Sequence, residues 1–256
     1  MYYFIRFNLN LVFDPSYLLN FLLVFSFGKR GAQTMQWYTG NTFYDTLLIV
    51  GFVYAALVFV SSLFGTAQYG GRFGGGKRSK GVKLHAKTGW VLMELPGLII
   101  FPIVFFMGEN SDQLVPLIFL AIWMIHYSNR ALYTPLMMRV QPGSSSSFAL
   151  NVVIAGWLTL FLHGYFNAAF ITQLGTQYTD AWLTDPRFII GMAIYLFGFS
   201  LNIHSDSILR NLRSKTPSAD EPRYKIPYGG AFRFVSCPQY LGEMLSFVGF
   251  AIMTWN

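Results

Sequence analysis

Charged side chains are scarce in this sequence. They make up 11% of its 256 residues, whereas soluble domains carry about 25%, so an ordinary water-soluble globular domain is excluded. Cysteine occurs once, at Cys237, and a disulfide within the chain is therefore impossible. Acidic residues are fewer than basic ones, 11 against 18. Because the basic excess lies between apolar segments, it indicates orientation in a membrane, and no nucleic-acid partner is expected.

Several site patterns are also absent. The sequence contains no His-Glu-x-x-His motif and its four histidines are scattered, so no metal site is predicted. No Gly-x-Gly-x-x-Gly follows a strand-like segment, and a dinucleotide would therefore bind outside a Rossmann fold. The stretch YGGRFGGGKRSK within 67–87 is basic and rich in glycine, but it lacks a Walker pattern. It suits either a phosphate-binding loop or a flexible cytosolic linker.

Long apolar runs are what the sequence has in abundance. Runs of roughly 20 residues recur, which is the length that crosses a bilayer. The predicted fold is therefore all-α, a polytopic transmembrane helical bundle that forms a single domain over 35–256. Residues 1–34 are expected to be an N-terminal extension of unknown role, because the apolar run 16–27 is short for a span. The expected spans are 45–66, 88–107, 114–136, 148–170, 187–209 and 238–255.

The charges of the connecting loops alternate along the chain. Basic residues crowd 67–87 and 210–237, and Arg139 follows the third span, whereas 108–113 has two acids and no base. Cytosolic loops of membrane proteins carry an excess of lysine and arginine. We therefore expect a multi-pass membrane protein with 67–87, 137–147 and 210–237 in the cytosol.

Ionisable residues inside the spans are candidate functional groups. Such groups are costly in a bilayer, by about 2.5–3.5 kcal/mol at a helix centre. Glu94 lies in the second span, close to Pro96, which frees a backbone carbonyl. Tyr127 and Arg130 share a helix face at the end of the third span. Glu94 suits either a site or a structural pair with a neighbouring helix, and the other two also suit a membrane-interface anchor.

A polar stripe runs along the end of the fifth span. Asn202, Asp206, Arg210 and Arg213 stand at i, i+4, i+8 and i+11, so they share one helix face. Glu243, early in the sixth span, is on the same side of the membrane. Amide, carboxylate and guanidinium groups together suit a nucleotide, although the stripe is also explained by an ordinary i,i+4 ion pair. His163 and Asn167 have no partner in the sequence pattern, and we interpret them as structural.

Six segments together resemble the steroid 5α-reductase family. They are YGG at 69–71, WVLMELPG at 90–97, HYSNR at 126–130, NIHSDSILRNLR at 202–213, YKIPYGGAF at 224–232 and VSCPQYLGE at 235–243. The resemblance implies an NADPH-dependent reductase of the 4,5 double bond of 3-oxo-Δ4-steroids. It also implies a seventh helix, beyond Asn256, and we expect a bacterial-type homologue with its cofactor site facing the cytosol.

The same resemblance implies roles for individual residues. Glu94 and Tyr127 match the pair that polarises the 3-oxo group while hydride is transferred to C5. Residues expected at the steroid are Tyr69, Trp90, Met93 and Arg130. Residues expected at NADPH are Asn202, Asp206, Arg210, Arg213, Tyr224, Lys225, Ser236, Gln239 and Glu243.

Three residues depart from the family pattern: Met93, Lys225 and Gln239 stand where the animal enzymes have glutamine, arginine and asparagine. The substrate does not follow from architecture, because related bundles serve other chemistries. The alternatives are a reductase of another lipid enone, an enoyl-CoA or a polyprenol, a methyltransferase, or a proton-coupled transporter with Glu94 as its proton site. No internal repeat, which many transporters have, is visible in the sequence.

Overall fold

The computed structural model describes residues 39–64, 82–140, 147–216 and 225–256. Its contacts divide the chain into two units, 1–41 and 42–256, and the description below concerns the second. The predicted extension 1–34 lies outside the described residues, as do Tyr69 and Tyr224. The division between that extension and a reductase domain therefore stays a prediction.

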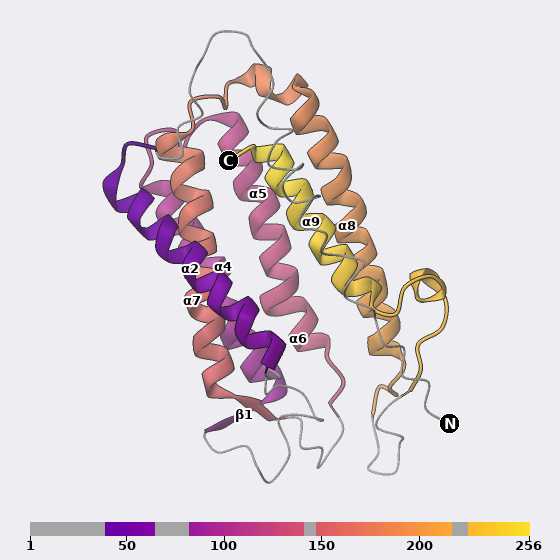
Figure 1. Cartoon of the computed structure of the whole chain (residues 1–256). Coiled ribbons are helices and arrows are strands. Elements are labelled where there is room, and N and C mark those ends of the chain that lie inside the picture. Colours follow the sequence, from indigo (N-terminus) through magenta and orange to yellow (C-terminus); the bar gives the residue numbers. More distant parts are fainter. Residues whose placement is uncertain (1–38, 65–81, 141–146, 217–224) are drawn as a thin grey trace. The chain divides into compact units, whose positions relative to one another are not determined.

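In the part of the chain that the structure describes, six long helices lie within a few residues of the six expected spans (Figure 1). Five spans are long and apolar enough to cross a membrane, and α9, with 17 residues, is shorter. The chain is therefore a polytopic helical membrane protein. The helices are α2 (Thr42–Phe64), α4 (Ala86–Phe106), α5 (Leu114–Ser128), α7 (Leu150–Ala169), α8 (Pro186–Asn211) and α9 (Pro238–Thr254), with the short α6 (Thr134–Met137) continuing the third span.

A two-stranded ribbon was not expected from the sequence. Strands β1 (Lys83–His85) and β2 (Ser147–Ala149) pair antiparallel, with Leu84 opposite Phe148. The ribbon ties the start of α4 to the start of α7 at the lower end of the bundle in Figure 1. Three-residue strands carry too little alternation for a sequence pattern to reveal them.

The core lies between α4, α5, α7, α8 and α9, and it is largely aromatic. Phe101 stacks on Trp123 with ring centroids 4.2 Å apart, and Phe119 meets Tyr178 edge to face. Both arrangements are favoured by aromatic rings. The outer faces of the helices remain exposed and apolar, and the 18-residue window of α2 has no buried residue. Such faces suit lipid, which solvates them at no hydrophobic cost.

Helices α8 and α9 run side by side because glycines let their backbones approach (Figure 1). A Cβ placed on Gly198 would lie 2.6 Å from the Gly242 carbonyl oxygen, and one on Gly249 would lie 2.7 Å from the Gly191 oxygen. Small residues at the interface are the usual means of close helix packing in membranes. This packing brings the lower end of α8 against the start of α9.

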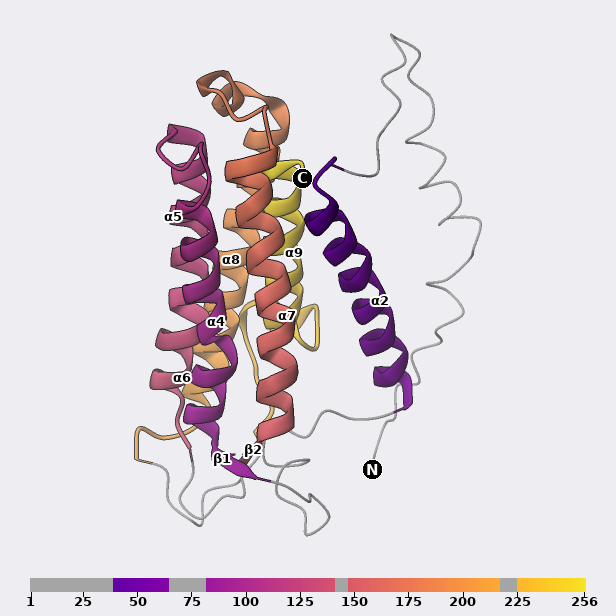
Figure 2. The ribbon, with the colours of Figure 1, turned by 90° about the vertical axis from the view of Figure 1, so that its left-hand side faces the viewer.

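Helices α4 and α7 form a second close pair (Figure 2). Pro96 has no N–H, so the carbonyl of Leu92, four residues earlier, loses its helical partner. The indole Nε1 of Trp157 on α7 donates to that carbonyl. The carbonyl freed by proline is therefore satisfied by the neighbouring helix, as polar backbone groups in a membrane require.

Candidate active site

Arg130 is the centre of a charged cluster inside the bundle. Its Nη2 atom lies 3.1 Å from Oε1 of Glu94 on α4, and its Nε atom lies 3.2 Å from Oε1 of Glu243 on α9. All three side chains are at most 18% exposed. One guanidinium thus joins two carboxylates from different helices, and it satisfies charges that would be costly alone.

The position of Arg130 follows from a local break in its helix. Residues Asn129–Tyr133 form one π-helical turn, η2, between α5 and α6. Pro135 lies just beyond and cannot donate to the carbonyl of Ala131. Wider turns of this kind often accompany functional sites.

A cavity of about 160 Å³ adjoins the charged cluster. Its walls come from the end of the third span, the end of α8 and the start of α9. Arg130 and Glu243 are part of the lining, so the ion pairs lie at the edge of the cavity. The other lining residues are Trp90, Thr134, Pro135, Met138, Asn202, Asp206, Leu209, Gln239 and Tyr240.

The structure brings together part of the predicted polar stripe. Asn202 is buried, and its Nδ2 atom donates to the backbone oxygen of Gln239 at 2.8 Å. Asp206 lines the cavity, and no ion pair joins it to Arg210 in the part of the chain that the structure describes. The i,i+4 ion pair is therefore not the explanation of the stripe.

Arg213 lies outside the cavity lining and faces another arginine. Its Nη1 atom donates to the backbone oxygen of Arg139 at 2.8 Å, and Arg139 in turn donates to the Arg213 oxygen. Arg210 contacts Ser207, at 3.3 Å, and the Tyr133 ring. In the sequence, Arg139 served only as a basic residue after the third span, and the structure pairs it with Arg213 through these two hydrogen bonds.

Tyr127 occupies a buried position near the end of α5, three residues before Arg130. It is 2% exposed, and its hydroxyl oxygen lies 3.1 Å from Nδ1 of His163 on α7. Glu94 contacts Arg130 instead. The interpretation of His163 as a structural residue without a partner missed this contact, because the two residues lie 36 positions apart on separate helices and no sequence spacing reveals the pair.

Of the remaining predicted residues in the described ranges, Trp90 is the one that the structure brings to the charged cluster. The Arg130 guanidinium is 5.7 Å from the centroid of the Trp90 ring. Met93 packs on Gly156 of α7, where a Cβ would lie 2.3 Å from Met93 Cγ. Its side chain therefore contributes to the packing between α4 and α7. Lys225 and Ser236 are exposed in the segment that leads to α9. No group of three or more potential metal ligands occurs among the described residues.

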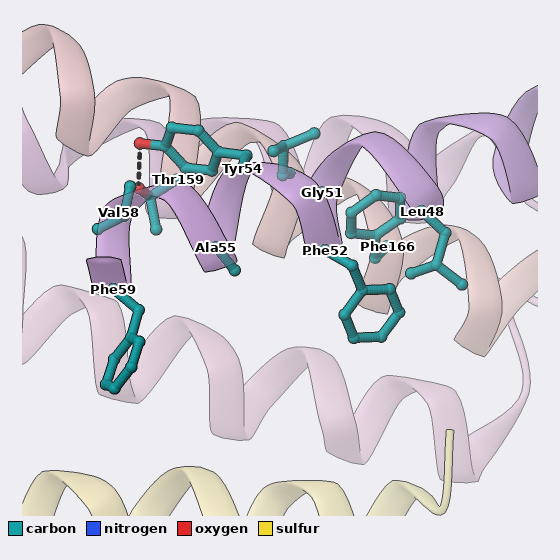
Figure 3. Close-up of a pocket in the computed structure, with 10 residues that line it drawn as sticks. Leu48, Gly51, Phe52, Tyr54, Ala55, Val58, Phe59, Thr159 and Phe166 are labelled. Carbon is teal, nitrogen blue, oxygen red and sulfur yellow. Dashed lines mark hydrogen bonds between the residues drawn. The ribbon is translucent and has the colours of Figure 1, made fainter. Parts of the chain in front are cut away.

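A second, apolar hollow lies between α2 and α7 (Figure 3). It measures about 530 Å³. Its polar side-chain atoms are the hydroxyls of Tyr54 and Thr159. The Tyr54 hydroxyl oxygen lies 3.1 Å from both Thr159 Oγ1 and the Ala155 carbonyl oxygen. We call it the α2–α7 groove, and its lining residues are Leu48, Gly51, Phe52, Tyr54, Ala55, Val58, Phe59, Thr159, Leu162 and Phe166.

Comparison with known proteins gives one family. Residues 146–256 match the family model described as 3-oxo-5-alpha-steroid 4-dehydrogenase. The 3-oxo-5-alpha-steroid 4-dehydrogenase 1 of Macaca fascicularis is 36% identical over 68% of this chain, which spans 64% of that relative, less than two thirds of its length. The enzyme of the same name from Bos taurus is 33% identical over 79% of this chain and 74% of the relative.

A plant protein is also similar to this chain. Steroid 5-alpha-reductase DET2 of Solanum lycopersicum is 31% identical over 80% of this chain and 76% of the relative. These relatives are animal and plant proteins, so the expectation of a bacterial-type homologue is not supported. With identities of 33% and 31% across about three quarters of the cattle and tomato proteins, this chain belongs to the steroid 5-alpha-reductase family of oxidoreductases.

Proposed function

We propose that this protein reduces the 4,5 double bond of 3-oxo-Δ4-steroids with NADPH. The family and the names of the relatives support the reaction class. The observation that carries the proposal is the buried arrangement of Glu94, Arg130 and Glu243 at the edge of a polar cavity, with the buried Tyr127 three residues before Arg130. Buried charges and hydroxyls inside a membrane bundle are rarely kept without a function.

The cavity residues suit one end of a dinucleotide. Gln239 Oε1 is buried and has no hydrogen-bond partner in the described part of the chain, so a donor such as a carboxamide or a ribose hydroxyl would satisfy it. Asp206 and Glu243 offer further acceptors. At about 160 Å³ the cavity is smaller than the roughly 300–1,000 Å³ of a whole ligand site. We therefore assign it to the nicotinamide end, and we assign the phosphates to the arginines that follow it on the third span and α8, Arg139, Arg210 and Arg213.

The protein's own task would be to stabilise negative charge on the 3-oxo oxygen. Bound NADPH would supply the hydride that adds to C5, and a proton from solvent would then add to C4, which completes the reduction of the double bond. Tyr127 would donate a hydrogen bond to the oxygen as it becomes an enolate, and such donors stabilise the transition state more than the ground state. Glu94 accepts from Arg130, so as a carboxylate it holds the guanidinium in place and donates to substrate only when protonated.

The apolar substrate would reach this centre from the lipid. The α2–α7 groove opens between two helices whose outer faces are apolar, and its lining has almost no polar surface (Figure 3). Its volume of about 530 Å³ lies in the range of sites for drug-sized molecules. We therefore propose the groove as the access route for the steroid.

Single substitutions in purified protein test the proposed reaction. Tyr127→Phe removes the hydroxyl and should lower kcat by about 10²–10³, the usual loss of an oxyanion donor. Glu94→Gln removes the carboxylate that holds Arg130 and should lower kcat as well, because the charge-assisted hydrogen bond to the guanidinium is lost. Both variants should still be stabilised against heat by NADPH. S-adenosylmethionine should not stabilise the wild type, which excludes the methyltransferase alternative. Turnover above about a tenth of wild type in both variants would overturn the site.

The choice of nucleotide gives a second measurement. NADPH carries a 2′-phosphate that NADH lacks, and guanidinium groups bind phosphate well. Arg213→Ala should therefore raise the KM for NADPH by about tenfold or more, leaving the KM for the steroid and the already high KM for NADH nearly unchanged. Equal use of both nucleotides by the wild type contradicts the assignment.

A further inference from the structure

The Tyr127 hydroxyl has a partner that the proposed reaction does not yet use. His163, on α7, places Nδ1 3.1 Å from that hydroxyl, while Tyr127 itself is on α5. The two helices are separate spans, so the contact exists only in the folded bundle. Among the groups discussed above, His163 is the one that lies within hydrogen-bond distance of the Tyr127 hydroxyl, the proposed donor to the substrate oxygen.

Aromatic rings fix the position of the His163 side chain. Its ring centroid lies 4.9 Å from that of Trp123 and 5.2 Å from that of Phe247. The backbone of the same turn is held as well, because Asn167 Nδ2 donates to the His163 carbonyl at 2.8 Å. The imidazole therefore presents Nδ1 from a constrained direction.

The Tyr127 ring is equally constrained. A Cβ on Gly97 would lie 2.3 Å from its Cδ1 atom, and the Trp123 ring centroid lies 4.8 Å away. The hydroxyl can rotate only its hydrogen, because the ring cannot move aside. Its direction of donation is then set by the neighbouring hydrogen-bonding groups, and the described contact is to His163.

A tyrosine has a single O–H to donate, and this decides the role of the histidine. If Tyr127 donated to His163, its O–H would not be free for the substrate oxygen. We propose that His163 is a positioning residue, the Nδ1–H of which donates to the Tyr127 oxygen and so directs the Tyr127 O–H to the substrate oxo group. This inference rests on the proposed reduction and adds a residue to it.

The arrangement also makes Tyr127 a stronger donor. Hydrogen bonds in a chain polarise one another, and a hydroxyl that accepts a bond donates more strongly. The effect acts through Tyr127, so losing it should cost less than losing the donor itself. We expect kcat to fall about tenfold to a hundredfold, as is usual when a partner that orients a functional residue is removed.

Four variants test the proposal in purified protein with NADPH and a 3-oxo-Δ4-steroid. His163→Phe keeps an aromatic ring against Trp123 and Phe247 but cannot donate, and it should lower kcat with little change in the KM for NADPH. His163→Asn, which places an amide near the Nδ1 position, should recover part of the loss. In the Tyr127→Phe background, His163→Phe should have no further effect on kcat, because its target hydroxyl is gone.

Each outcome separates this inference from the function on which it rests. A wild type that reduces the steroid while His163→Phe keeps its full kcat overturns the role of His163 alone. Equal losses from His163→Phe in the wild-type and Tyr127→Phe backgrounds overturn it too, since they indicate a packing defect. A wild type that reduces no steroid enone overturns the proposed function, and the role of His163 with it.

Discussion

The ring of Tyr127 lies directly against the backbone of Gly97. A Cβ placed on Gly97 would be 2.3 Å from ring atom Cδ1 and 2.5 Å from Cε1, closer than real side chains come. Glycine at this position is therefore what allows Tyr127 to reach its buried place. The contact joins the second and third spans at the level of the proposed site.

Gly97→Ala should displace the Tyr127 ring. Overpacking of this kind costs about 1–3 kcal/mol of stability, and the displaced hydroxyl should lower kcat for steroid reduction at least tenfold. Gly164→Ala is a matched control on α7, because a Cβ there meets its nearest atom, Phe101 N, at 3.4 Å. Turnover and thermal unfolding of both variants are the measurements, and a Gly97→Ala variant that behaves like Gly164→Ala would contradict the packing argument.

Arg130 should be required for the stability of the fold, mainly because it neutralises two buried acids. Arg130→Met leaves Glu94 and Glu243 without their cation, and breaking a buried pair in this way costs about 3–5 kcal/mol. Thermal unfolding in detergent should show the loss directly. Adding Glu94→Gln and Glu243→Gln to Arg130→Met removes the unpaired charges and should restore most of the stability. If the triple variant is as unstable as the single one, the charge explanation is wrong.

The helices could be predicted from the sequence because their cause is local. A run of about 20 apolar residues has few alternatives to a membrane span, and all six expected spans match helices of the structure. Glu94 and Arg130 were also visible, since ionisable residues stand out inside apolar runs. Their mutual contact was left open, because the sequence does not say how two helices are rotated about their axes.

The contacts between distant segments could not be predicted in the same way. His163 meets Tyr127 across 36 positions, and Arg139 meets Arg213 across 74. Neither pair has a fixed spacing, and each depends on how the spans pack. Met93 was expected at the substrate from the family resemblance alone, and that place stays a prediction. Its packing on Gly156 of α7 is a further contact between separate spans that no sequence spacing reveals.

Orientation in the membrane can be tested with engineered cysteines. The basic excess of 67–87 and 210–237 predicts that the end with β1 faces the cytosol. In a Cys237→Ser background, Glu109→Cys should react with an impermeant thiol reagent added to intact cells, whereas Lys83→Cys should react only after permeabilisation. Both positions are exposed in the structure, so burial does not explain a difference. The reverse pattern of labelling would show the opposite orientation.

The α2–α7 groove should control access of the steroid without affecting the chemistry. Ala55 lines the groove (Figure 3). The next residue, Ala56, is equally exposed but is not part of the lining. Ala55→Phe adds a ring in the groove, so it should lower kcat/KM for the steroid on the order of tenfold, which corresponds to about 1.4 kcal/mol. Because α2 contributes no residue to the charged cluster or to the cavity lining, kcat at saturating steroid and the KM for NADPH should not change. Ala56→Phe adds the same ring toward lipid and should leave all three quantities as they are. Equal effects of the two substitutions, or no effect of Ala55→Phe on the steroid, would mean that the substrate reaches Tyr127 by another route.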